Sequence, residues 1–350
     1  MKKLFLSLVA LVVATLSYAQ GSLLATLSHD GQISAFYGAN ALKQAMAAAE
    51  SGDVITLSSG QFNAVNITKP ITLRGAGMSV NTDSINPHEA TILQGAFSIN
   101  IADSLSGRVI MEGLYSNSNV TYTGVLKNAQ FQKCRFLNFI AGTGASITNS
   151  SFIHCRIYNG FKQNENSNVF FINSIVCAPR SESMSSSIEF DNCFVKYDYN
   201  SNYGIYVYQV VNAYYKNCVI QATYYGGNST IPSSCVAYNC VSVGNYSGIF
   251  NNMTSKNTTN KYLSSPTGFF KTYTATGHGT YINDSWSFEP TESAAKTYLG
   301  TDGTQVGIYG GNLPYDEDPT IPQITKCNVA SKSTADGKLS VDIEVKAAEY

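Results

Sequence analysis

One short pattern of apolar and polar positions occurs six times between residues 129 and 242. All six copies have a thiol or hydroxyl at one position, and five of them have an aromatic residue three positions before it and an apolar residue two positions after it. If the thiol position is numbered zero, it is occupied by Cys134, Cys155, Ser174, Cys193, Cys218 and Cys240. Position −3 holds Phe131, Phe152, Phe171, Phe190, Tyr215 and Ala237. The copies lie 19 to 25 residues apart, and a period near twenty with a fixed register is typical of stacked coils that bury their apolar edges against each other.

The apolar residues of each copy alternate with mixed ones, and the phase of this alternation changes once. Alternation of period two predicts a strand with one face in a core, and the change of phase between positions −3 and zero predicts a bend between two strands. The residue before position zero is asparagine in four copies, as Asn173, Asn192, Asn217 and Asn239. Because asparagine tolerates the left-handed backbone of a sharp corner, the pattern predicts coils of short strands stacked about 4.8 Å apart.

This pattern predicts an all-β fold, a parallel β-helix solenoid of about ten coils in the chain of 350 residues. Leucine-rich repeats have a similar period, but they need a recurring leucine column, and Leu126 and Leu137 of this run do not recur. The repeats resemble the right-handed parallel β-helix superfamily, which contains pectate lyases and many non-catalytic repeat proteins. The resemblance implies a right-handed coil.

The segment before the coils is expected to close the first end of the stack. Ser22–Tyr37 alternates around Asp30-Gly31, which predicts a hairpin. Ala39–Glu50 is predicted as a helix with Asn40 as its N-cap. Its apolar stripe would consist of Leu42, Ala45, Met46 and Ala49. The following residues, Gly52 to Gly77, closely resemble the first coil that is common to secreted bacterial β-helix proteins.

The expected organisation of the chain has four parts. They are a signal peptide (1–19), an N-terminal hairpin and capping helix (20–51), a parallel β-helix (52–315, irregular over 246–299), and a linker with a C-terminal β-hairpin (316–350). Asp302–Tyr315 resembles the closing segment of such solenoids, a last strand followed by a Gly-Gly turn. The hairpin is predicted from Gln323–Val329 and Lys338–Val345, either as a cap of the stack, which we favour, or as a tag for secretion or a partner.

The N-terminus and the charge indicate where the protein works and with what. Lys2 and Lys3, an apolar stretch from Leu4 to Leu16 and the small residues around Ala19 predict an export signal, so we expect a periplasmic, cell-surface or extracellular protein. No later stretch is apolar and long enough for an integral membrane segment. With 13% charged residues and a net charge of −1, nothing favours nucleic acid as a partner.

Five of the eight cysteines occupy position zero, where a thiol would behave as a small buried hydrophobe. Stacked neighbours would come within disulfide range, but their parallel Cβ vectors fit disulfide geometry poorly. We therefore expect reduced thiols, with a disulfide framework as the alternative. No Cys-x-x-Cys or histidine cluster accompanies them, so no metal or other cofactor is expected.

Two carboxylates are the candidate catalytic pair of a glycosidase. Glycoside hydrolysis needs two carboxyl groups about 5 to 10 Å apart. Glu189 and Asp191 lie two residues apart on the outward face of one predicted strand, so their side chains can stand about 7 Å apart. The alternative, which we favour, is a solvated sheet face beside Lys216 of the next coil.

Arg135 and Arg156 stack at the position after the ladder cysteines, where an exposed pair could hold a carboxylated polymer. A solvated pair without a ligand is the alternative. Pectate lyases also need an acidic cluster for calcium, and none adjoins these arginines. The polygalacturonase-like strings Asn81–Asp83 and Gly277–Gly279 lie far apart in sequence without the paired aspartates and basic triplet that belong with them, so we interpret them as chance matches.

Tyrosines are the remaining candidate ligand-binding residues. The predicted stack lengthens between Cys193 and Cys218, and insertions on one face of a solenoid often carry binding sites. The candidates there are Tyr199, Tyr203, Tyr206, Tyr208 and Tyr214. Aromatic rings in a row on a rigid sheet can stack on sugar rings, although a tyrosine column that only covers the sheet is the alternative.

The sequence thus favours an exported, non-catalytic β-helix protein that binds a polysaccharide or cell-surface glycan or forms an adhesive or structural surface. A polysaccharide lyase or glycoside hydrolase is the alternative, which the shortage of clustered carboxylates disfavours. The ligand and the oligomeric state are not indicated.

Overall fold

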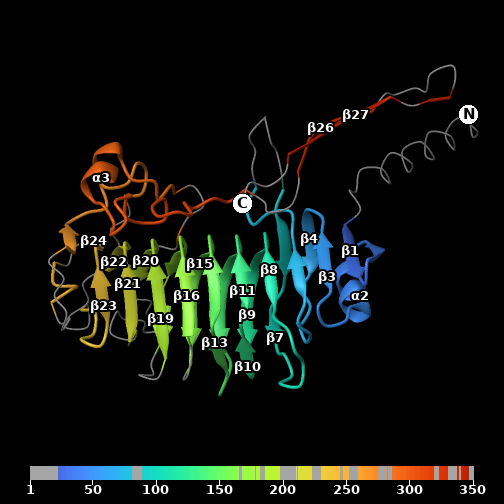
Figure 1. The fold of residues 1–350 in the computed structure, drawn as a ribbon, viewed down its shortest axis with the longest axis horizontal. Helices are drawn as coiled ribbons and strands as arrows, with labels where there is room; N and C mark the ends of the chain where they lie inside the picture. The colour runs from blue at the N-terminus through green and yellow to red at the C-terminus, as the bar shows by residue number, and fades with distance from the viewer. Residues whose placement is uncertain are drawn as a thin grey trace, which may run out of the picture.

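The computed structural model describes residues 23–80, 89–164, 168–177, 179–181, 186–197, 210, 212–222, 230–244, 247–251, 259–274, 282, 286–318, 323–329, 337–338 and 340–346. The fold is a parallel β-helix of about eight turns, as predicted (Figure 1). It has fewer turns than expected because the described residues between 264 and 318 do not continue the stack but lie against its side.

Two parallel sheets form the walls of the stack. The coil strands of sheet A are β3 (Val54–Leu57), β5 (Thr72–Arg74), β8 (Ile110–Glu112), β11 (Gln130–Gln132), β14 (Ser150–Ile153), β16 (Asn168–Ile172), β19 (Ser187–Asp191), β21 (Ala213–Lys216) and β23 (Val236–Tyr238). The main strands of sheet B are β4 (Gly60–Asn63), β6 (Thr91–Gln94), β9 (Tyr115–Tyr122), β12 (Arg135–Ala141), β15 (Arg156–Gln163), β17 (Ile175–Cys177), β20 (Phe194–Tyr197), β22 (Val219–Ala222), β24 (Val241–Val243) and β25 (Lys261–Leu263).

Four short strands complete the walls. In sheet B, β7 (Phe97–Ile99) pairs with β9 and β18 (Pro179–Ser181) pairs with β15, while β10 (Val125–Lys127) and β13 (Ser146–Thr148) pair with each other. The long strands β9, β12 and β15 bend within sheet B. The bend is marked by a shift in the pairing register between Phe136 and Asn138 of β12.

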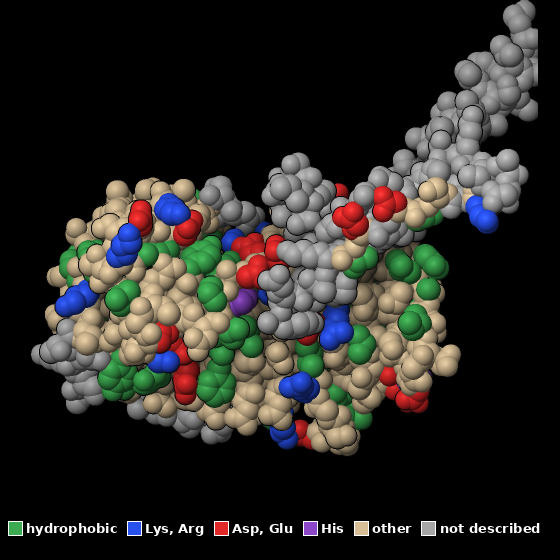
Figure 2. Space-filling view, turned by 45° about the horizontal axis from the view of Figure 1, so that its top comes forward, with side chains coloured by type: hydrophobic (Ala, Val, Ile, Leu, Met, Phe, Trp, Pro, Cys, Tyr) green, Lys and Arg blue, Asp and Glu red, His purple; other side chains and the backbone are tan. Residues whose placement is uncertain are grey.

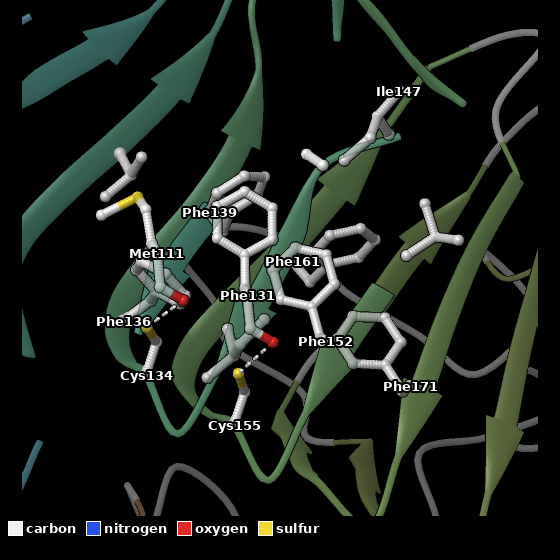
Figure 3. Packing of buried hydrophobic residues seen from close by; sticks show 14 of the residues in the cluster. Met111, Phe131, Cys134, Phe136, Phe139, Ile147, Phe152, Cys155, Phe161 and Phe171 are labelled. Carbon is white, nitrogen blue, oxygen red and sulfur yellow. Dashed lines mark hydrogen bonds between the residues drawn. The ribbon is translucent and has the colours of Figure 1, made fainter. Parts of the chain in front are cut away.

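The column at position −3 forms the centre of the core (Figure 3). Adjacent rings of Phe131, Phe152, Phe171, Phe190 and Tyr215 stack with centroids 4.5 to 5.3 Å apart and interplanar angles of 10° to 20°. A second column contributes Phe139 and Phe161, whose rings meet the first column edge to face. All of these side chains are fully buried, so the predicted repeat register is confirmed.

The thiol column lies at the bend between sheet A and sheet B, and its residues are completely buried. Four of the five sulfurs point toward a carbonyl of the preceding coil, as Cys134 Sγ does toward Met111 O at 3.3 Å and Cys155 Sγ toward Phe131 O at 3.4 Å (Figure 3). Ser174 Oγ donates to Phe152 O in the same way at 3.1 Å. None of the cysteines on the described part of the stack forms a disulfide, which confirms the expectation of thiols. Burial raises the pKa of Cys155, so it stays protonated.

The corner before position zero adopts the left-handed conformation that the asparagine column predicted. The φ angles of Asn173, Asn192, Asn217 and Asn239 are 43°, 51°, 55° and 48°. Lys133 and His154 occupy the same corner in earlier coils, with φ of 48° and 51°. A non-glycine residue at these angles is strained, which favours asparagine there.

The N-terminal end of the stack carries β1 (Leu24–His29), β2 (Gln32–Tyr37) and α2 (Ala41–Ala48). The strands form the predicted hairpin around Asp30 and Gly31, both with positive φ, and β1 pairs antiparallel with β3. The helix buries its predicted apolar stripe against the first strands. Asn40 occupies the N-cap position, but its side chain makes no capping hydrogen bond, so that part of the expectation is wrong.

The C-terminal segments depart from expectation. α3 (Glu292–Thr297) follows the last coil, and Leu299–Asp318, which we call the strap, returns along the corner column (Figure 1). Asp302–Tyr315 therefore supplies no closing strand of the stack. Gly310 allows the strap its tight turn, because a Cβ there would meet Gln305 O at 1.7 Å.

The terminal hairpin consists of β26 (Gln323–Val329) and β27 (Val341–Lys346), close to the predicted residues. It forms a two-stranded sheet of its own and pairs with neither sheet A nor sheet B among the described residues. Figure 1 shows it projecting outward above the N-terminal half of the stack and covering neither end, so the expectation that it caps the stack is not met.

Candidate functional site

The outward face of sheet A over β19, β21 and β23 carries a group of side chains that we call the tyrosine surface. It consists of Glu189, Asp191, Tyr214, Lys216, Val236 and Tyr238. Successive side chains of a strand point to opposite faces, and the buried residues between these, such as Phe190 and Tyr215, point into the core. The parallel register aligns Glu189 with Tyr214 and Asp191 with Lys216. The outward side chains of these three coils therefore lie next to one another on one surface.

Two tyrosine rings lie next to each other on this surface. Tyr214 and Tyr238 have ring centroids 5.6 Å apart with an interplanar angle of 46°. Tyr214 is 37% exposed, so its ring is accessible to a ligand. Partial burial, followed by the neighbouring Tyr238, raises the pKa of Tyr214, so its hydroxyl remains both a donor and an acceptor at neutral pH.

Charged groups lie directly beside the rings. Lys216 Nζ donates to Asp191 Oδ2 at 3.0 Å, and both side chains are half-exposed. This hydrogen bond raises the pKa of Lys216. Glu189 is exposed beside Tyr214. Figure 2 shows charged side chains of both signs next to hydrophobic ones over this half of sheet A. The surface can therefore combine ring stacking with hydrogen bonds of several kinds.

Glu189 and Asp191 have the arrangement that the sequence predicted. They lie on one strand two residues apart and face outward, so their carboxyl groups are about 7 Å apart. Asp191 is bound by Lys216 in an ion pair, as the alternative of a solvated face with Lys216 proposed.

The two candidate arginines stack in register as predicted, but the expectation that they are exposed is wrong. Arg156 is only 12% exposed, and its guanidinium pairs with Glu317 of the strap and donates through Nε to Tyr315 Oη at 2.6 Å. Arg135 lies between the rings of Tyr115 and Tyr158, at 4.1 and 4.5 Å from their centroids. The strap therefore occupies the place where an acidic polymer would have to reach Arg156.

The strap is anchored by one polar contact after another along the corner column. Asn173 Nδ2 donates to Ile308 O and Gly310 O, both at 2.7 Å. Lys133 Nζ donates to Asp316 Oδ2 at 2.6 Å and to Asp318 O at 2.7 Å. Figure 2 shows acidic side chains gathered beside basic ones and a histidine in the middle of this view. The left-handed corners thus present their side chains to the strap.

His154 is a buried titratable group in the contact between the stack and the strap. Its Nε2 lies 3.0 Å from Leu313 O, and its Nδ1 is buried without a hydrogen-bond partner. Burial lowers the pKa of His154 from its ordinary value near 6.5; the charge of Lys133 also lowers it, while the Leu313 carbonyl and Asp316 oppose the shift. Asp316 itself has a lowered pKa, because its bonds with Lys133 outweigh its burial.

We expect the strap to loosen as the pH falls below about 6.5. Because the released histidine binds a proton more readily than the docked one, docking is strongest above the pKa of the released state and weakens as the pH falls below it. Hydrogen exchange of residues 299–318 at pH 7.5 and 5.0 measures this. The control is His154→Asn, since asparagine fits the same corner in later coils and does not titrate; equal pH dependence in both proteins would contradict the assignment.

Four of the candidate ligand-binding residues, Tyr199, Tyr203, Tyr206 and Tyr208, lie outside the described residues. Asn81–Asp83 and Gly277–Gly279 lie outside them as well. Tyr214 is the candidate tyrosine that the structure places on the surface. Its neighbour Tyr238 was not singled out from the sequence. Tyr214 lies three residues before Asn217 and Tyr238 lies one residue before Asn239, so the repeat register places both side chains on the outward face of adjacent coils.

Known proteins offer no guide to this surface: no protein-family model, no curated protein and no solved structure matches the chain. The described residues contain no group of three or more histidine, cysteine or acidic side chains suited to holding a metal ion. No helix in the described part of the chain is long and apolar enough to cross a membrane.

Proposed function

We propose that the protein is an exported, non-catalytic β-helix protein whose tyrosine surface binds polysaccharide. The observation that carries the proposal is the pair of neighbouring rings, Tyr214 and Tyr238, held on adjacent coils of a rigid sheet and flanked by charged hydrogen-bonding groups. Aromatic side chains with polar tips combine a flat apolar face with hydroxyl hydrogen bonds. Sugar rings present the matching combination of apolar faces and equatorial hydroxyls.

Rigidity of the surface supports this function. Glu189, Tyr214 and Val236 are flanked along their strands by buried core residues. Strands β19 and β21 are paired on both sides, and β23 is the last strand of sheet A. A binding surface fixed in this way loses little conformational entropy when a ligand binds. An extended polymer that crosses several coils can therefore gain from many weak contacts.

The binding test uses a panel of soluble neutral and acidic oligosaccharides with isothermal titration calorimetry. We expect the double variant Tyr214→Ala and Tyr238→Ala to weaken binding of the best ligand by at least about tenfold, since stacking and aromatic burial contribute more than about 1.4 kcal/mol. The matched control is Tyr37→Ala, which removes a tyrosine that is 64% exposed at the far end of the stack. Unchanged binding in the double variant would remove this surface from the function.

A hydrolase that uses Glu189 and Asp191 is the second candidate, favoured by their common outward face beside the rings. Release of reducing ends from the same panel separates the two functions. Turnover that is abolished in Glu189→Gln or Asp191→Asn would overturn the non-catalytic proposal. Binding without turnover, retained in Glu189→Gln, is the expected result.

Export is supported by residues 1–19 and by the resemblance of the first coil to secreted bacterial β-helix proteins. We expect the exported protein to begin at Gln20. N-terminal sequencing of the protein recovered outside the cytoplasm checks this, and an intact Met1 in that fraction would contradict it.

A further inference from the structure

Among the described residues, the first strand in the order of sheet A, β2, pairs only with β1, so its other edge is open. Gly38 N donates to Leu23 O at 2.8 Å, and β1 and β2 pair antiparallel with Ala25 opposite Phe36. In such a ladder the hydrogen-bonded and non-hydrogen-bonded pairs alternate. The residues of β2 with even numbers therefore bond to β1, and Ile33, Ala35 and Tyr37 direct their N–H and C=O groups to the open edge.

The same three residues carry exposed side chains on the outward face. Phe36 lies opposite buried Ala25 and faces the core, so its neighbours in the strand face outward. Ile33 is 75% exposed and Tyr37 is 64% exposed. β2 contains no charged residue and no proline, which are the usual means by which proteins prevent an edge strand from pairing.

One register makes this edge complementary to itself. If two copies of β2 pair antiparallel with Ala35 opposite Ala35, then Ile33 of each copy lies opposite Tyr37 of the other. All three pairs are of the hydrogen-bonded kind, because these residues direct their backbone groups outward, and six backbone hydrogen bonds result. The two exposed large side chains then cover each other across the joint, with the small alanine on the two-fold axis.

Charge and shape agree with this register. It brings the hairpin turn with Asp30, whose side chain is 92% exposed beside His29, to the side of the joint where α2 of the second copy begins after Asn40, and a helix N-terminus favours negative charge. The next exposed residue of that helix, Lys43, has the opposite charge to Asp30. The exposed face of α2 also carries Ala47 and Ala48, whose small side chains permit close approach of the two stack ends.

We propose that two copies of this chain join through β2 in this register, so that sheet A runs unbroken through a dimer with α3 at each outer end. The proposed dimer interface lies at the N-terminal end of the stack. Figure 1 shows β1 and α2 at this end and α3 at the opposite end. This interaction is independent of the polysaccharide function, since the tyrosine surface lies on other strands.

Sedimentation velocity across a concentration series tests the dimer. We expect a concentration-dependent dimer whose dissociation constant rises at least about tenfold in Ala35→Pro, which removes an N–H that faces the open edge and leaves the bonds to β1 intact. Ala35→Thr keeps the N–H and is the matched control. Ile33→Lys, which places charge at the joint, is a second disrupting variant, and circular dichroism verifies that each variant is folded.

The register is tested by Ala35→Cys, since residues opposite each other in a hydrogen-bonded pair have Cα atoms about 5.5 Å apart, within disulfide range. We expect this variant to form a disulfide-linked dimer under mild oxidation, whereas Val80→Cys, at an exposed site elsewhere, does not. A wild-type chain that stays monomeric at all concentrations, or a dimer that Ala35→Pro and Ile33→Lys leave unchanged, overturns the proposal.

Discussion

Replacing Phe171 by alanine is expected to lower the free energy of unfolding by about 3 to 5 kcal/mol. The ring is completely buried and stacks between Phe152 at 4.8 Å and Phe190 at 5.3 Å, with Phe161 edge-on at 5.0 Å. Its removal leaves a cavity in the middle of the aromatic column. The neighbouring coils cannot close this cavity, because their spacing is fixed by the backbone ladders on both sides. Denaturant unfolding followed by circular dichroism measures the change.

Phe170→Ala is the matched control, since the same side chain is removed one position away. Phe170 lies on the outward face of β16 and is only partly buried. We expect a loss of about 1 kcal/mol or less, because only part of the ring is buried. Equal losses in the two variants would contradict the assignment of the two faces.

The second large effect is expected from Glu317→Ala in the strap. Glu317 pairs with Arg156 and also accepts hydrogen bonds from Tyr315 Oη at 2.9 Å and Ser79 Oγ at 2.6 Å. Loss of this carboxylate leaves the guanidinium of Arg156 buried without its countercharge, which costs about 3 kcal/mol. The strap should then detach. We expect faster hydrogen exchange and faster proteolytic cleavage between residues 299 and 318, with sheet A unchanged.

Glu292→Ala provides the control, because Glu292 forms an ion pair with Lys296 on the exposed surface of α3. Such surface pairs contribute about 0 to 1 kcal/mol. The double variant Arg156→Met with Glu317→Leu should recover most of the lost stability, since an apolar pair of similar volume needs no countercharge. A strap that stays protected in Glu317→Ala would show that the corner contacts alone hold it.

The repeat could be predicted from the sequence because each coil buries its side chains against the adjacent coils. The aromatic column, the thiol column and the left-handed asparagine corner follow from short-range patterns that recur, and all three appear in the structure. The outward position of Glu189, Asp191 and Tyr214 follows from the same register. A contact between Tyr214 and Tyr238 needs only that register extended by one coil.

The strap could not be predicted because its contacts are neither local nor repeated. Many of them join a side chain of the corner to a backbone carbonyl far along the chain, as Asn173 does to Ile308 and His154 to Leu313, and a carbonyl has no sequence signature. One signal was available: the position after zero changes from Arg156 to Ile175, Phe194, Val219 and Val241. Strands that are apolar on both faces are covered on both, and residues 269–315 cover this part of sheet B.

Contacts of the strap join residues 135, 183 and 238 positions apart. A solenoid without such contacts can lose its end coils one by one, because each coil interacts only with its neighbours. Here a segment that is synthesised after all of the turns ties late turns to early ones. Unfolding should consequently approach a single cooperative transition, and the earlier turns must persist without this restraint until synthesis is complete.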